Sequence, residues 1–175
     1  MSTTLKRAVG PALAAGLVVT ALASPAAAQT PGSTAFRLFG TAFLNARAGV
    51  ANQMTASVVG GRLIFEDMTG VAVGPGCRRL TATSADCGVA TTVGGLAIQM
   101  GDGIDTYQGL VGMRTVVEGG PGADTVETGA GNDTIGVSGD MTVDTVVSCG
   151  GGSDVVFRDP GDLFLNPATC ERRIP

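Results

Sequence analysis

The 175-residue chain contains no histidine and no tryptophan, and it has no lysine after Lys6. Without histidine, a Ser-His-Asp triad, a Cys-His pair and a histidine-based zinc site are all excluded. The formal net charge is −4, and residues 101–162 carry eleven acids against two arginines, a balance that disfavours nucleic acid and attracts cations.

Residues 1–28 are expected to be a cleaved signal peptide. Lys6 and Arg7 precede the apolar stretch 8–23, and Ala26-Ala27-Ala28 has the small-x-small pattern of a signal peptidase site. Glycine and proline interrupt the stretch, so the unbroken apolar run is shorter than the ~20 residues of a membrane span. We therefore expect a secreted, extracellular protein without a stable membrane span.

Residues 29–99 are expected to form a small β-rich region. Residues 29–50 look like a linker that leads into an arm. Residues 54–59 and 62–67 flank Gly60-Gly61, which predicts a hairpin. Further along, Leu96 and Ile98 alternate toward one face of a strand.

Four cysteines in a chain with a secretory leader predict disulfides. Three connectivities are possible for Cys77, Cys87, Cys149 and Cys170. Proximity in the sequence favours Cys77–Cys87 and Cys149–Cys170. A four-thiolate zinc site is the alternative, but the chain has no C-x-x-C pair.

The region 100–175 contains a short internal repeat centred on aspartate. Steps of nine to eleven residues separate its rungs, and each rung has a β-branched or aromatic residue two places after the aspartate position. Such self-similarity predicts a β-solenoid, in which each unit buries its apolar side chain against the next. The residues at the aspartate position are Asp105, Arg114, Asp124, Asp133, Asp144 and Asp154.

Two rungs should make one coil of about eighteen residues, since each rung supplies a glycine turn and a short strand. In each strand we expect the aspartate to point outward and the apolar residue inward. Alternate rungs then stack on the same edge. Asp105, Asp124 and Asp144 would line one edge, and the other would carry Arg114, Asp133 and Asp154.

Stacked carboxylates about 5 Å apart repel one another unless a cation lies between them. Turn carbonyls freed by glycine add hard oxygen ligands. A site of carboxylate and carbonyl oxygens favours Ca²⁺, which tolerates irregular coordination better than Mg²⁺ does. The alternative is that the aspartates cap turns without metal, as Asx residues do.

The segments "GGPGADTVE" (119–127) and "TGAGNDTIG" (128–136) resemble the G-G-x-G-x-D-x-U-x nonapeptide of RTX, or haemolysin-type, calcium-binding repeats. "MGDGIDTYQ" (100–108) and "CGGGSDVVF" (149–157) are similar. The chain also resembles short secreted RTX-like proteins of high-GC Gram-positive bacteria. The resemblance implies an all-β fold with a parallel β-roll over residues 100–175, closed by a disulfide cap.

The resemblance also implies the calcium ligands. The carboxylate ligands would be Asp105, Asp124, Asp133, Asp144 and Asp154, and the turn backbone would come from Gly120, Gly122, Gly129 and Gly131. Arg114 in place of an aspartate should abolish one site or bridge it with its guanidinium. We expect the remaining acids of this region, Asp102, Glu118, Asp140, Asp159 and Asp162, to be solvated, although Asp140 could reach a neighbouring site.

Three classes of function are compatible with these features. The first is a non-catalytic, secreted calcium-binding protein. The second is an adhesin or matrix component that uses a metal-poor solenoid as a scaffold. The third, an enzyme or its accessory module, is disfavoured because the chain has no histidine and no nucleophile elbow. The sequence names no protein or cell-wall partner.

Overall fold

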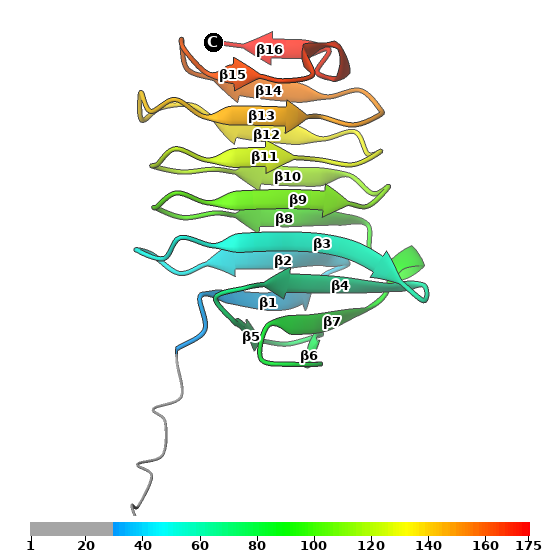
Figure 1. The fold of residues 1–175 in the computed structure, drawn as a ribbon. Coiled ribbons are helices and arrows are strands. Elements are labelled where there is room, and N and C mark those ends of the chain that lie inside the picture. The colour runs from blue at the N-terminus through cyan, green and yellow to red at the C-terminus, as the bar shows by residue number, and fades with distance from the viewer. Residues whose placement is uncertain (1–29) are drawn as a thin grey trace, which may run out of the picture.

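The computed structural model describes residues 30–175, so the expected signal peptide lies outside the described residues. The prediction of an all-β chain is confirmed (Figure 1). The helical elements of the described residues are two 3₁₀ turns, η1 (Ala90–Thr92) and η2 (Pro167–Thr169). None of the helices in this part of the chain is long and apolar enough to cross a membrane.

The strands form two sheets of eight, here called sheet A and sheet B. Across sheet A the order is β5 (Val71–Val73), β1 (Ser33–Leu38), β2 (Thr41–Ala46), β8 (Gly95–Gln99), β10 (Thr115–Glu118), β12 (Thr134–Val137), β14 (Val155–Arg158) and β16 (Arg172–Ile174). Across sheet B it is β6 (Arg78–Arg79), β7 (Ser84–Val89), β4 (Arg62–Asp67), β3 (Gln53–Val59), β9 (Thr106–Leu110), β11 (Thr125–Glu127), β13 (Thr145–Ser148) and β15 (Leu163–Phe164).

From β8 onward, successive strands alternate between the two sheets, and from β10 onward each pairs in parallel with the strand two places before it. We call one strand of each sheet with its two turns a coil. In Figure 1, β9, β11 and β13 run to the right and β8, β10 and β12 run to the left. Each strand from β8 to β14 contributes a buried apolar residue to the space between the sheets: Ile98, Tyr107, Val117, Val126, Ile135, Val146 and Val156.

The expectation of a linker and arm over residues 29–50 is wrong, because this segment contains the β1–β2 hairpin. Its buried face consists of Ala35, Ala42 and Leu44, so small alanines weaken the hydrophobic alternation that marks a strand. The turn residues Phe39 and Gly40 have φ of 48° and 86°. Positive φ at both positions is typical of a two-residue hairpin turn.

The predicted hairpin around Gly60-Gly61 is confirmed, with β3 and β4 antiparallel. Both sheets then continue across residue 99, since β8 pairs in parallel with β10 and β3 pairs in parallel with β9. The two sheets are therefore mixed. Antiparallel pairs stand at one end, which we call the base, and parallel pairs make up the remainder.

Both favoured disulfides are confirmed. Cys77–Cys87 ties the loop after β5 to β7 in the base. Cys149–Cys170 ties the end of β13 to the last turn before β16. The two bridges therefore lie at opposite ends of the stack, where each sheet has edge strands with fewer neighbours.

Substitution of a turn glycine tests how tightly successive coils are stacked. Gly122 has φ of 139°, and a Cβ there would overlap the carbonyl oxygen of Gly103 in the coil below. We expect Gly122→Ala to lower the free energy of unfolding by about 2–5 kcal/mol, measured by denaturant titration. Gly112→Ala is the matched control, because a Cβ there meets nothing within 4 Å. Equal stability of the two variants would contradict the tight stacking.

Candidate metal centre

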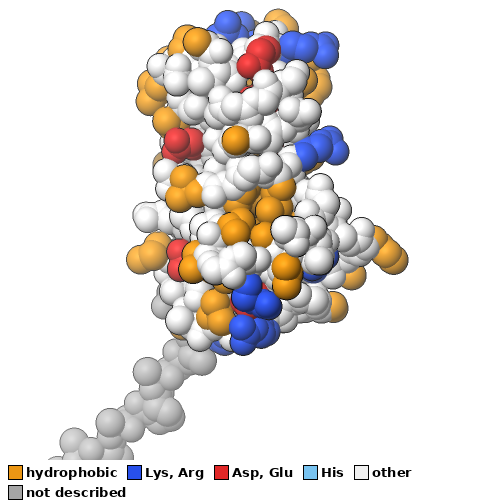
Figure 2. All heavy atoms as spheres, turned by 90° about the vertical axis from the view of Figure 1, so that its right-hand side faces the viewer, with side chains coloured by type: hydrophobic (Ala, Val, Ile, Leu, Met, Phe, Trp, Pro, Cys, Tyr) orange, Lys and Arg blue, Asp and Glu red, His pale blue; other side chains and the backbone are white. Residues whose placement is uncertain are grey.

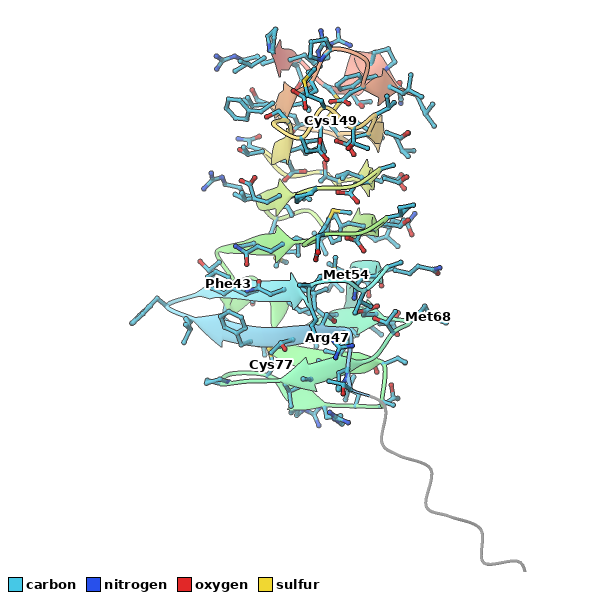
Figure 3. All side chains as sticks on the ribbon, turned by 90° about the vertical axis from the view of Figure 1, so that its left-hand side faces the viewer. Phe43, Arg47, Met54, Met68, Cys77 and Cys149 are labelled. Atoms are coloured by element: carbon cyan, nitrogen blue, oxygen red, sulfur yellow. A yellow bond between two sulfur atoms is a disulfide. The ribbon has the colours of Figure 1, made fainter. Side chains whose placement is uncertain are left out.

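The aspartates that precede the strands of sheet B form one hydrogen-bonded column, which we call the first column. In each step, the backbone N–H of one residue donates to the side-chain oxygen of the residue one coil further along. The donor–acceptor distances are 2.6 Å from Asn52 to Asp105, 2.9 Å from Asp105 to Asp124, 2.7 Å from Asp124 to Asp144 and 3.0 Å from Asp144 to Asp162. Figure 3 looks onto the edge of the stack where these strands begin.

A second column follows sheet A on the opposite edge. The N–H of Thr115 donates to Asp133 Oδ1 at 2.7 Å, the N–H of Asp133 donates to Asp154 Oδ1 at 2.7 Å, and the N–H of Asp154 donates to Glu171 Oε2 at 2.8 Å. The structure thus brings Asp105, Asp124 and Asp144 together on one edge, and it places Asp133 and Asp154 on the other.

The expectation that Arg114 occupies an aspartate position is wrong by one residue. Val116 pairs with Thr134, so Thr115 stands opposite Asp133. Arg114 is exposed and lies one place earlier. The error arose because "MRTVVE" contains two adjacent valines, and the register depends on Val117, not Val116, being the buried one.

The expectation that the aspartates point outward is also wrong. Asp105, Asp124, Asp133, Asp144 and Asp154 are each at most 1% exposed. Residues two apart on a strand share a face, so each aspartate points to the same side as the apolar residue that follows it. The residue between them, threonine in four of the five cases, faces outward.

Each of these five carboxylates has one oxygen without a partner. Their Oδ2 atoms are buried and make no hydrogen bond within the described residues. In the coil of Asp124, this oxygen is turned back into its own glycine turn, since a Cβ on Gly119 would lie 2.9 Å from it. A buried, unpaired carboxylate oxygen is costly, so each one marks a place for a proton or a cation.

The turn glycines bring backbone carbonyls to the same place. A Cβ on Gly120 would overlap the carbonyl oxygen of Gly101, as one on Gly122 would overlap that of Gly103. Neither carbonyl accepts a hydrogen bond from a described residue. On the other edge, Gly129 and Gly131 lie in the same way over the carbonyl oxygens of Val111 and Met113. Glycine is required at these four positions, because a side chain would fill the space between the turns.

Burial raises the pKa of the stacked carboxyl groups. The pKa of Asp124 rises to about 7, chiefly by desolvation and further by the charges of Asp105, Asp144 and Asp140, against the hydrogen bond from Asp105. Desolvation likewise raises the pKa of Asp133 and of Asp144 to about 6 each. The columns are therefore electrostatically strained when fully ionised and without a counter-ion.

Sequence reasoning missed several members of this arrangement. Asp162, expected to be solvated, extends the first column, and Glu171 extends the second. Their separations of 18 and 17 residues from the preceding members match one coil, so the period could have found them. Asp140 and Asp159 also hold turn amides: Asp140 Oδ2 accepts from Gly122, and Asp159 Oδ2 accepts from Gly139 and Met141.

Within residues 30–175, no group of three or more histidine, cysteine, aspartate or glutamate side chains is arranged to hold a metal ion. Any cation site here must therefore combine fewer carboxylates with backbone carbonyls. Comparison of the chain with protein-family models, with curated proteins and with solved structures found no match.

The raised pKa values predict an unusual pH dependence of stability in a chelator. Between about pH 4 and pH 7 the folded protein retains protons that the unfolded chain has already released, so stability should fall as the pH rises through this window. We expect a lower melting temperature at pH 7.5 than at pH 5. Asp124→Asn, which keeps an oxygen to accept the N–H of Asp105, should reduce this slope. A melting temperature that rises over the same interval would contradict the assignment.

Proposed function

We propose that this protein is a secreted, non-catalytic calcium-binding protein whose glycine–aspartate turns form an RTX-like β-roll. The observation that carries the proposal is the set of five buried aspartate oxygens without partners. Those of Asp105 and Asp124 face glycine turns directly, since a Cβ on Gly103 or on Gly119 would lie 3.6 or 2.9 Å from them. Residues of the first column that would hold the ion are Asp105, Asp124 and Asp144, together with the carbonyl oxygens of Gly101 and Gly103.

The chemistry of these donors fits calcium. Carboxylate and carbonyl oxygens are hard ligands, and Ca²⁺ accepts six to eight of them at irregular angles. Since backbone carbonyls serve as ligands, a calcium site does not need three carboxylates in one group. Bound Ca²⁺ would neutralise the stacked carboxylates and supply the missing partner of each Oδ2. The chain's own contribution is the fixed spacing of these oxygens along each column.

The arrangement of strands supports a β-roll. From β8 to β16 the strands alternate between two sheets, and after Asn52 the successive members of each column are 17 to 21 residues apart. This period matches two nonapeptide repeats for one coil. The antiparallel pairs of the base are the departure from a uniform parallel roll.

Two disulfides and a signal-like leader support an extracellular location, where calcium is abundant and thiols are oxidised. In that setting, calcium binding would stabilise the folded stack, because the unfolded chain has no preformed site. This role needs no catalytic group.

One observation favours the second candidate, a metal-poor scaffold of an adhesin or matrix protein. Every stacked aspartate already accepts a backbone N–H through Oδ1, so the coils are hydrogen-bonded to one another without a cation. In this case the carboxyl groups would act as Asx-type caps, and protons would replace calcium on the Oδ2 atoms.

A calcium titration of the purified protein separates the two candidates. We expect heat of binding by calorimetry and a rise in melting temperature, amounting to about 2.7 kcal/mol at a calcium concentration 100 times Kd. Asp124→Asn combined with Asp133→Asn should abolish most of both effects, because one carboxylate is removed from each column while the hydrogen-bonding oxygen is kept.

The matched control is Glu118→Gln combined with Glu127→Gln. It removes the same number of charges from the same region, at the ends of β10 and β11, from side chains outside both columns: that of Glu118 is exposed, and that of Glu127 accepts from Gln108 Nε2. We expect it to bind calcium as the parent does. Absence of calcium binding in the parent protein would reject the proposal and leave the scaffold as the function.

A further inference from the structure

Two hairpin turns of the base are linked through the segment between β7 and β8, which lies at the right-hand edge in Figure 1. They are the β1–β2 turn at Phe39-Gly40 and the β3–β4 turn at Gly60-Gly61. The η1 segment joins them, because the N–H of Gly94 donates to Gly40 O at 2.8 Å and the N–H of Ala90 donates to Gly61 O at 2.9 Å. The two turns are therefore held as one surface.

Large apolar side chains are exposed along this surface, which we call the apolar rim. Its members and their exposed fractions are Leu38 44%, Phe39 106%, Val58 43%, Val59 62%, Val89 45% and Leu110 59%. Figure 2 faces this edge, and hydrophobic side chains gather across its lower half. Single exposed apolar residues need no explanation, whereas a group of six on neighbouring elements indicates a contact surface.

Phe39 adopts an unfavourable backbone conformation at the β1–β2 turn. Its φ of 48° lies in the left-handed region, where a two-residue hairpin turn favours asparagine or glycine. An aromatic residue in this region is strained, and the side chain gains nothing from packing because it is fully exposed. Neither turn geometry nor core packing accounts for phenylalanine at this position.

The rim is flanked by arginines. Arg62 Nε and Arg78 Nη2 both bind Asp86 Oδ2, at 2.5 and 2.7 Å, and Arg37 donates to Thr92 in η1. Asp86 is the one carboxylate beside them on the hairpins, β7 and η1, since Glu66 and Asp67 lie at the far end of β4. Three arginines against one aspartate leave a positive charge next to the rim. In Figure 2, Lys/Arg side chains lie directly below the hydrophobic group.

We propose that the apolar rim and its arginines form a docking surface for a lipid bilayer that carries anionic headgroups. Phe39 and Val59 would enter the interfacial region from the two turn tips, while Arg37, Arg62 and Arg78 lie against the headgroups. Apolar tips with adjacent cations are the combination that binds a protein at a membrane interface without a spanning segment. A protein partner would not require apolar side chains to project singly from two turn tips.

A second exposed apolar pair has acidic neighbours and therefore allows a comparison with the arginine-flanked rim. Met141, with φ of 62°, and Val143 are 77% and 51% exposed at a turn on the opposite edge. Asp140 and Asp159 lie at this turn, since Asp159 Oδ2 accepts the N–H of Met141 and Asp140 Oδ1 accepts that of Thr142. This tip matches the rim in exposure and backbone geometry but not in charge, so it serves as a control.

The test is co-sedimentation with vesicles of phosphatidylcholine alone or with 30% phosphatidylglycerol, in calcium-containing buffer. We expect binding to the anionic vesicles that weakens with salt. Phe39→Ser combined with Val59→Ser should lower the partition coefficient about tenfold or more. Arg78→Gln should lower it about fivefold. Met141→Ser combined with Val143→Ser, and Arg172→Gln at the other end of the stack, should leave it unchanged.

Circular dichroism and melting temperature establish that each variant is folded. Bridging of the acidic turns to lipid by calcium would survive the rim substitutions, and that result would overturn the proposal. Failure of the parent protein to bind anionic vesicles would overturn it as well. So would a parent dimer that the rim substitutions convert to a monomer, because the rim would then be a self-association surface. The calcium titration is independent of all these outcomes.

Discussion

The stack depends on one repeated hydrogen bond, in which a buried aspartate accepts the backbone N–H at the equivalent position of the preceding coil. This bond fixes the register of neighbouring coils, since a shift of one residue would replace the carboxylate by an outward-facing side chain. This hydrogen bond uses only one of the two oxygens of each carboxylate. The other oxygen, Oδ2, is buried without a hydrogen-bond partner. The same aspartate that aligns two coils therefore also favours binding of a proton or a cation.

The edge strands are protected in different ways at the two ends of the stack. At the base, antiparallel hairpins and the Cys77–Cys87 bridge cover the sheet ends, and Asn52 terminates the first column with a neutral side chain that bonds to Asp67. At the other end, the short strands β15 and β16 limit the unpaired edge, and Cys149–Cys170 fastens the final turn. The acidic turns and the arginines of the base thereby lie on separate parts of the same two sheets.

The sequence was most informative where a repeat was present. The period and the edges on which the aspartates stack followed from spacing, and proximity favoured the two observed disulfides among three possible connectivities. The β1–β2 hairpin within residues 29–50 could not be predicted, because buried alanines give little difference in hydrophobicity between the two faces of a strand. The burial of the aspartates was missed for another reason: a carboxylate is ordinarily assumed to be solvated, and only the hydrogen bond across coils reveals why these are not. Thr115 was missed because neighbouring valines allow two registers.

The hydrogen bonds of both columns run in one direction, with each amide served by a side chain that comes later in the chain. A chain that emerges N-terminus first from an export channel would therefore present every new coil with its amide unpaired. The base has its own disulfide and hairpins and can close early. The columns are complete only once Asp162 and Glu171 are in place, so the C-terminal segment from Asp162 onward supplies the last acceptor of both columns.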